Sequence, residues 1–145
     1  MFRDDARPAK FEGYFTEFKV TEPELNRRLF KQASFQCLVA ENGGTAVRYL
    51  AYYALPFTYD LTPWLWIKEL YVIDNRQCRR KGIGKTLMER LTSEAHKQGS
   101  GKIKWKVLST NLNAKTFYLQ LGASSELEWQ IWSLSKKTIF DLSHQ

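Results

Sequence analysis

The sequence Glu69-Leu-Tyr-Val-Ile-Asp-Asn-Arg-Gln-Cys-Arg-Arg-Lys-Gly-Ile-Gly-Lys85 decides the fold of this chain. Its first residues are β-branched and aromatic, which is typical of a buried strand, and a basic turn then leads to Gly82-Ile-Gly84. An amphipathic helix should follow, because apolar residues recur every four positions from Ile83 and Gly99 stands where the helix would end. Glycines let a backbone approach a ligand closely, and a helix N-terminus attracts an anion through its N–H groups and its dipole. The stretch therefore predicts a phosphate-binding turn between a strand and a helix.

Spacing separates three phosphate-binding motifs that compete for this turn. A Walker A loop needs Gly five residues before Gly84, where Arg79 stands, and a dinucleotide fingerprint needs Gly or Ala three residues after Gly84, where Leu87 stands. The pattern that fits is Arg79-x-x-Gly82-x-Gly84, which resembles the acetyl-CoA motif (Arg/Gln)-x-x-Gly-x-(Gly/Ala) of the GNAT superfamily of N-acetyltransferases. The resemblance implies that acetyl-CoA is the acetyl donor and that backbone N–H groups along the turn hold its pyrophosphate. These residues are Arg79, Arg80, Lys81, Gly82, Ile83, Gly84 and Lys85.

A second motif lies downstream. Asn111-x-x-Ala114-x-x-x-Tyr118-x-x-x-Gly122-Ala123 resembles the GNAT pattern Asn-x-x-Ala-x-x-x-Tyr-x-x-x-Gly-(Phe/Ala), so the likeness extends over roughly residues 35–134. It implies that Asn111 and Ala114 contact the cofactor and that Tyr118 protonates the departing thiolate. The proton transfer is downhill, because an unperturbed tyrosine titrates near ~10 and a thiol near ~8.5.

The resemblance also assigns the strand before the turn. Backbone groups of Leu70, Tyr71 and Val72 would bond the pantetheine arm as though it were an extra strand, in the gap where two parallel strands splay. Within the superfamily the chain is most similar to the diamine (spermidine/spermine-type) N-acetyltransferases, through Phe57-Thr-Tyr-Asp60 and Glu128-Trp129 among other segments. The implied acceptor is the primary amine of a small molecule that is diamine-, polyamine- or amino-acid-like, attacking the thioester directly in a ternary complex.

The acceptor amine needs a base. An alkylammonium of pKa ~10.4 must lose its proton to attack, which costs roughly 4–5 kcal/mol at pH 7, and a carboxylate can accept that proton. Where diamine acetyltransferases carry Glu-Asp, this chain has Lys68 and Glu69, so Glu69 is our candidate base. Lys68 should repel a polyamine. We place Lys68, Glu128 and Trp129 on the substrate side.

Composition sets outer bounds. The 145 residues are 43% hydrophobic, enough for the core of one domain spanning the whole chain, and no apolar run approaches the ~20 residues of a membrane span. The first residues do not resemble a signal peptide. Cys37 and Cys78 form neither a disulfide framework nor a metal-ligand spacing, so we expect no metal and a cytoplasmic setting. The net charge of +7 suits an anionic ligand such as acetyl-CoA.

Periodicity supplies the remaining elements. Alternation and the turn Asn42-Gly43-Gly44 predict a hairpin, and a capping box at Thr21–Glu24 predicts a helix to about Lys31. The predicted strands are 35–41, 46–55, 64–72, 102–108 and 126–134, a further helix is 113–121, and 136–142 is a strand or a helical turn. The order of these elements suits a mixed sheet with helices on its faces. The family resemblance implies the α/β (α+β), GNAT-like form of it: a mixed, mostly antiparallel sheet with helices on both faces. The first strand that family members have is lacking, and a second copy could cover the exposed edge, so we expect a homodimer.

Alternatives stay open. The chain could be a catalytically degenerate module that binds CoA without turnover, or a basic nucleic-acid-binding domain, although its lysines and arginines are dispersed. Tyr118 could be an ordinary core aromatic residue, Glu69 could pair with a neighbouring cation, and Asn111 could be only a helix cap.

Overall fold

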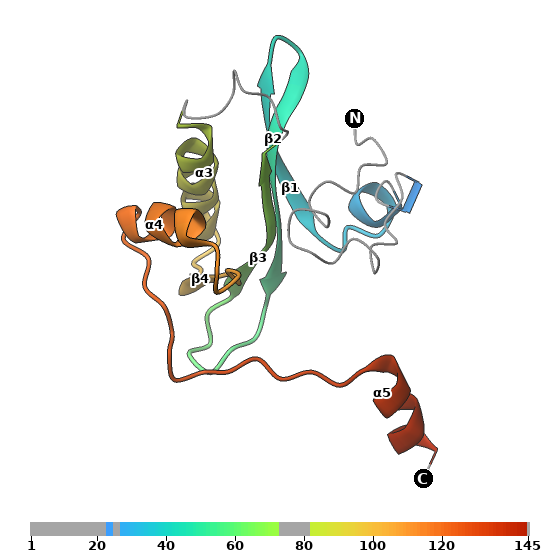
Figure 1. The fold of residues 1–145 in the computed structure, drawn as a ribbon. Coiled ribbons are helices and arrows are strands. Elements are labelled where there is room, and N and C mark those ends of the chain that lie inside the picture. The colour runs from blue at the N-terminus through green and yellow to red at the C-terminus, as the bar shows by residue number, and fades with distance from the viewer. Residues whose placement is uncertain (1–22, 25–26, 73–81, 145) are drawn as a thin grey trace. The chain divides into compact units, whose positions relative to one another are not determined.

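The computed structural model describes residues 23–24, 27–72 and 82–144. The chain divides into two compact units, Met1–Asn111 and Leu112–Gln145, and each is described by itself. Figure 1 shows the elements in chain order. The expected absence of a first strand concerns residues outside the described ranges.

The first unit is built on a four-stranded sheet in the order β1-β2-β3-β4 (Figure 1). Its strands are β1 (Gln36–Asn42), β2 (Thr45–Leu55), β3 (Trp64–Val72) and β4 (Lys102–Lys104). β2 pairs antiparallel with both β1 and β3, whereas β3 and β4 run parallel. The predicted mixed, mostly antiparallel sheet is confirmed.

The β1–β2 hairpin forms where its turn residues predict it. Gly43 and Gly44 both have positive φ, 58° and 78°. Two consecutive left-handed residues define the type I′ turn, whose twist matches that of the flanking strands and which glycine adopts without steric cost.

Helix α3 (Ile83–Lys97) supplies the core on one face of the sheet. Its buried apolar residues include Leu91, which is fully enclosed, as are Leu50 of β2 and Leu65 of β3. The strand register places Leu50 and Leu65 on the same face, so this is the face that α3 covers. The helix ends at the predicted place, because Gly99 adopts φ 67° directly after the C-cap.

Strand β4 is shorter than predicted. The alternation of residues 102–108 indicated a strand with its lysines on a solvated face, but only Lys102–Lys104 pair with β3. Lys102 and Lys104 are half-buried, because each ammonium group lies over the Trp64 ring, 4.9 Å from its centroid. The side chains of these two lysines therefore cover Trp64 and are also partly exposed to solvent.

The second unit contains α4 (Leu112–Gln120) and α5 (Lys136–Ser143). The predicted helix near 113–121 is confirmed, and the ambiguous C-terminal segment is helical, with the Ser135 hydroxyl accepting a bond from the backbone N–H of Thr138. The predicted strand 126–134 is wrong. This segment is irregular and leaves Leu127, Trp129 and Ile131 exposed. An alternating pattern becomes a strand only where another strand pairs with it, and this unit contains none among its described residues.

The predicted N-terminal helix is described only in part. Pro23 and Glu24 are helical, and Arg27–Lys31 form η2, a short π-helix rather than the expected α-helix. Glu24 forms ion pairs with Arg27 and Arg28. Hydrogen bonds from Arg27 and then Arg28 lower the pKa of Glu24 to about 2.

Candidate active site

Strand β4 pairs with only the first three residues of β3. Their parallel pairing joins Trp64, Leu65 and Trp66 to the three residues of β4, whereas β3 continues to Val72. No pairing of β3 with β4 is described beyond Trp66. The family resemblance places the pantetheine arm along residues 70–72, and this placement stays a prediction. The N–H and C=O groups of an unpaired strand edge can bond an extended ligand as they would another strand.

A β-bulge in β3 sets the direction of the candidate base. Ala51 and Tyr52 are consecutive on β2, but their partners on β3 are Glu69 and Ile67, so Lys68 has no partner residue on β2. The extra residue reverses the alternation of side chains along β3. If Lys68 were paired in the ladder, Glu69 would share the α3-covered face with Ile67. Because Lys68 is left out of the pairing, Glu69 lies on the opposite face, and Lys68 is exposed.

The Glu69 carboxylate lies in a half-buried polar cluster. The Tyr49 hydroxyl donates to Glu69 Oε2 at 3.0 Å, and the rings of Tyr49 and Tyr71 lie 5.7 Å apart at a tilt. Cys37, Ala51 and Glu69 form a row across three strands, which brings the thiol onto the same face. Glu69 therefore accepts a hydrogen bond from a tyrosine of the neighbouring strand.

Burial dominates the chemistry of the groups around Glu69. Burial, and then the negative charge of Glu69, raise the pKa of Cys37 to about 11. The same two causes, together with the hydrogen bond to Glu69, raise the pKa of Tyr49 well above its usual range. Both groups are neutral at pH 7, so Cys37 is a poor nucleophile and Tyr49 a hydrogen-bond donor.

The candidate phosphate turn is only partly within the described residues. Arg79, Arg80 and Lys81 lie outside them. Gly82 is the N-cap of α3 in the left-handed conformation, with φ 68°, and no side chain caps the helix. Its carbonyl accepts bonds from the backbone N–H and the hydroxyl of Thr86, at 3.0 and 3.2 Å.

The first turn of α3 has the charge that an anion requires. It contains no acidic residue, and the exposed Lys85 forms an ion pair with Glu89 one turn further on, at 3.7 Å. Gly84 is buried and carries no side chain. The N-terminal N–H groups of a helix favour an anion, and no acidic side chain of this turn competes for that place.

The other motif residues lie at the unit boundary and on α4. Asn111 ends the first unit and donates its N–H to the Leu108 carbonyl at 2.9 Å. Ala114 and Tyr118 are half-buried on α4, and the Tyr118 ring lies 5.2 Å from that of Phe117. Tyr118 and Glu69 belong to different units, so each is described in its own surroundings.

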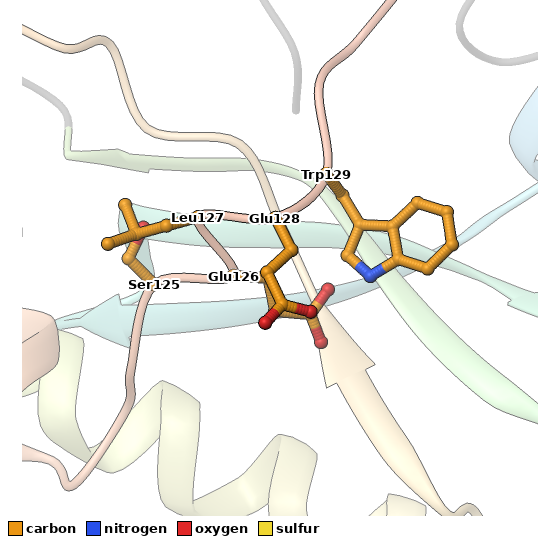
Figure 2. Close-up of a pocket in the computed structure, with 5 residues that line it drawn as sticks. All are labelled: Ser125, Glu126, Leu127, Glu128 and Trp129. Carbon is orange, nitrogen blue, oxygen red and sulfur yellow. The ribbon is translucent and has the colours of Figure 1, made fainter.

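An open pocket in the second unit brings two acids together. It is lined by Ser125, Glu126, Leu127, Glu128 and Trp129. Figure 2 shows the carboxylates of Glu126 and Glu128 directed the same way, with the Trp129 indole to one side. Sequence reasoning selected Glu128 and Trp129 but missed Glu126. The two-residue spacing of the acids was the available signal.

No cluster of three or more His, Cys, Asp or Glu residues that could hold a metal ion occurs among the described residues. Within the same residues, no helix combines the length and apolar character needed to cross a membrane.

The family model of the acetyltransferase (GNAT) family matches residues 1–123. The match covers most of the chain, and the chain belongs to this family. Over 57 residues, 39% of this chain, it is 42% identical to the L-ornithine N5-acetyltransferase NATA1 of Arabidopsis thaliana. That alignment spans 25% of the plant protein, so the chain corresponds to about a quarter of the curated relative's length.

Solved structures support the same fold. An integron cassette protein from the mobile metagenome of V. cholerae matches 92% of this chain and 85% of its own, with a TM-score of 0.76 and 24% identity. The ribosomal-protein-alanine N-acetyltransferase of Brucella melitensis biovar Abortus 2308 matches 93% and 96%, with a TM-score of 0.67 and 19% identity. An aminoglycoside acetyltransferase from an uncultured soil metagenomic sample, in complex with sisomicin, matches 93% of both chains, with a TM-score of 0.68 and 22% identity.

Proposed function

We propose that this protein transfers the acetyl group of acetyl-CoA to the primary amine of a small cationic molecule, by direct attack in a ternary complex. One observation carries the proposal. Glu69 directly follows the bulge at Lys68. It lies on the part of β3 beyond its pairing with β4, and its side chain is on the sheet face opposite α3. A carboxylate is thus held beside the strand edge where the resemblance places the pantetheine arm.

The residues that would hold acetyl-CoA fit its charge and shape. Backbone N–H groups from Arg79 to Lys85 would bind the pyrophosphate at an α3 N-terminus that has neither an acidic residue in its first turn nor a capping side chain. Backbone groups of Leu70, Tyr71 and Val72 would bond the pantetheine arm, and Asn111 and Ala114 would contact the cofactor. When bound, acetyl-CoA supplies the activated thioester.

Two side chains would move the protons. Glu69 would take the ammonium proton of the acceptor, directly or through a water molecule. Tyr118 would give its phenolic proton to the departing thiolate. Each role rests on the motif position and on the residue's own surroundings. The amine nitrogen loses two protons in becoming an amide: the first goes to Glu69, and the second would restore the Tyr118 phenol through water, so that CoA leaves as the thiol and Glu69 releases one proton to solvent.

The acceptor is proposed from charge. Glu126 and Glu128, with the Trp129 indole beside them, offer two carboxylates and an aromatic face, which suit an ammonium group. Within the first unit and independently of this pocket, the exposed Lys68 ammonium next to Glu69 disfavours a purely cationic acceptor and favours one that also carries a carboxylate. An amino-acid-like diamine carries both kinds of charge, as does the ornithine named for the partial relative. We therefore propose such a molecule ahead of a polyamine.

The first experiment is calorimetric titration of the purified chain with acetyl-CoA, CoA and ATP. We expect both CoA species to bind and ATP not to bind. Acetyl transfer is then measured with ornithine, lysine and putrescine as acceptors, and the amino acids should be preferred. Binding without turnover on any acceptor would instead support the degenerate CoA-binding module.

Replacing Tyr118 with Phe separates catalysis from binding. A general acid contributes on the order of 100-fold or more, so kcat should fall by about that factor while the acetyl-CoA Kd stays within about twofold. Tyr53→Phe is the matched control, because Tyr53 is an exposed tyrosine of β2. An unchanged kcat would remove Tyr118 from the mechanism. Salt-dependent binding of labelled duplex or single strands, with no binding of CoA, would favour the nucleic-acid alternative.

A further inference from the structure

We propose that Tyr49 is a positioning residue for Glu69. The Tyr49 hydroxyl donates to Oε2 of Glu69 and thereby holds the carboxylate in the orientation in which it can accept a proton from the acceptor amine. The inference rests on the proposed function, because it takes Glu69 to be the base. Nothing in the sequence singles out Tyr49, which lies in the middle of an apolar strand, 20 residues before Glu69.

The geometry fixes Tyr49 from both sides. Its backbone pairs with Val39 of β1 and with Tyr71 of β3, so it stands in the interior of the sheet rather than at an edge. The residue directly opposite Glu69 is Ala51, whose methyl group offers the carboxylate no hydrogen bond. Tyr49 is the diagonal neighbour on the same face, within reach of a long side chain. Its hydroxyl meets Oε2 at 3.0 Å.

The bulge makes this contact possible. Regular pairing through Lys68 would place Glu69 on the face covered by α3, and Tyr49 lies on the other face. Because Lys68 is left out of the pairing, Glu69 lies opposite Ala51 and on the same face as the Tyr49 hydroxyl. A half-buried phenol packed against the Tyr71 ring has few alternative rotamers, so the donor is held ready before any substrate binds.

The hydrogen bond also favours the charged form of Glu69. A donor to a carboxylate stabilises the anion, and burial opposes it. Among the described residues of the sheet, the titratable groups that share this face or adjoin Glu69 are Cys37 of β1, Tyr49 and Tyr53 of β2, Lys68 and Tyr71 of β3, and Lys102 and Lys104 of β4. Burial and the Glu69 charge keep the thiol and the Tyr49 phenol neutral, so neither becomes a competing anion at neutral pH. Without the Tyr49 hydroxyl, Glu69 should bind a proton more readily.

The test compares Tyr49→Phe with Tyr53→Phe. The first removes the hydroxyl and keeps the ring against Tyr71, and the second removes an exposed hydroxyl from the same strand and the same face. kcat/KM for the amine is measured against pH at saturating acetyl-CoA. One hydrogen bond to a carboxylate predicts a loss of roughly three- to tenfold at pH 7 in Tyr49→Phe. The acidic limb of its profile should move up by about half a unit to one unit.

A merely structural tyrosine would not move the acidic limb. If the acidic limb of the kcat/KM profile of Tyr49→Phe coincides with those of the wild type and Tyr53→Phe, the proposal is overturned. Glu69→Gln supplies a second criterion: in that background the replacement of Tyr49 should have little further effect. If the full loss persists without the carboxylate, Tyr49 does not act through Glu69.

Failure of the proposed function is recognised separately. Wild-type protein that transfers no acetyl group to any amine removes the acetyltransferase activity. The contact can then be tested by ¹³C NMR of the glutamate side chains, with the Glu69 resonance assigned from its loss in Glu69→Gln. A higher Glu69 pKa in Tyr49→Phe than in Tyr53→Phe supports the hydrogen bond, and equal values overturn it.

Discussion

Replacing Gly101 with Ala tests the junction that aligns β3 with β4. Gly101 lies just before β4 and donates its N–H to the Pro63 carbonyl at 3.1 Å, just before β3. An added Cβ would lie well inside van der Waals contact of Thr62 Oγ1 and 3.0 Å from Asp60 Oδ2. The Thr62 hydroxyl already donates to Asp60 Oδ1 at 2.7 Å. The methyl group can be accommodated only by disrupting this contact or by moving the start of β4.

The expected magnitude follows from overpacking. Forcing one extra carbon into a packed site costs about 1–3 kcal/mol. For a chain of this size each kcal/mol lowers the melting temperature by roughly 2–5 °C, so we expect a decrease of about 3–10 °C. Since β4 positions the gap beyond Trp66, acetyl-CoA affinity should fall as well.

Thermal unfolding followed by circular dichroism measures the effect. Thr62→Ala removes the hydroxyl that the methyl would meet, so the double variant should regain much of the stability lost in Gly101→Ala. Gly99→Ala is the control, because Gly99 has positive φ and open space around it. The decrease in melting temperature of this variant measures the cost of backbone strain alone. A Gly101→Ala protein as stable as the wild type, or no recovery with Thr62→Ala, would refute the close approach of the two segments.

Two further predictions concern titration. In a Cys78→Ser variant, Cys37 of the folded protein should react with iodoacetamide at pH 8 about 100-fold more slowly than the same thiol in denaturant. The reason is that folding raises the pKa of Cys37 from 9.0 to about 11, so far less thiolate is present. Equal rates in the folded and denatured protein would contradict this. Hydrogen bonds from Thr58 and then Thr62 hold the pKa of Asp60 well below its usual range. Their stabilising effect is therefore complete above the unfolded pKa of ~3.9 and is lost as the pH falls below it. Asp60→Asn should accordingly melt below the wild type at pH 7, and the two should converge toward pH 2; a constant difference would exclude the carboxylate as the cause.

Local signals predicted the elements that depend on local physics. The paired glycines after Asn42 determine the hairpin turn, and the spacing of apolar residues between Ile83 and Gly99 determines α3. Alternation failed where a strand needs a distant partner. Residues 126–134 have a strand pattern but adopt no regular structure, and β4 ends at Lys104.

The candidate site was predictable only where a motif carries it. Glu69 was selected because diamine acetyltransferases carry acidic residues at positions 68 and 69, but its orientation depends on the bulge at Lys68, which no property of a lysine indicates. Its contact with Tyr49 depends on the register of two strands. Such contacts between residues far apart in sequence follow from tertiary pairing, which hydrophobic periodicity does not encode.

The bulge places Lys68 where its side chain can change without affecting the stability of the sheet. Because Lys68 has no partner on β2 and is exposed, substitutions there should leave the core packing of Leu50 and Leu65 intact. The charge presented at this point can therefore change by single substitutions. Deletion of Lys68 alone would make the pairing regular and leave Glu69 opposite Ala51, so the carboxylate would keep its face. Position 68 can thus vary in charge or be lost without moving Glu69 to the helix-covered side.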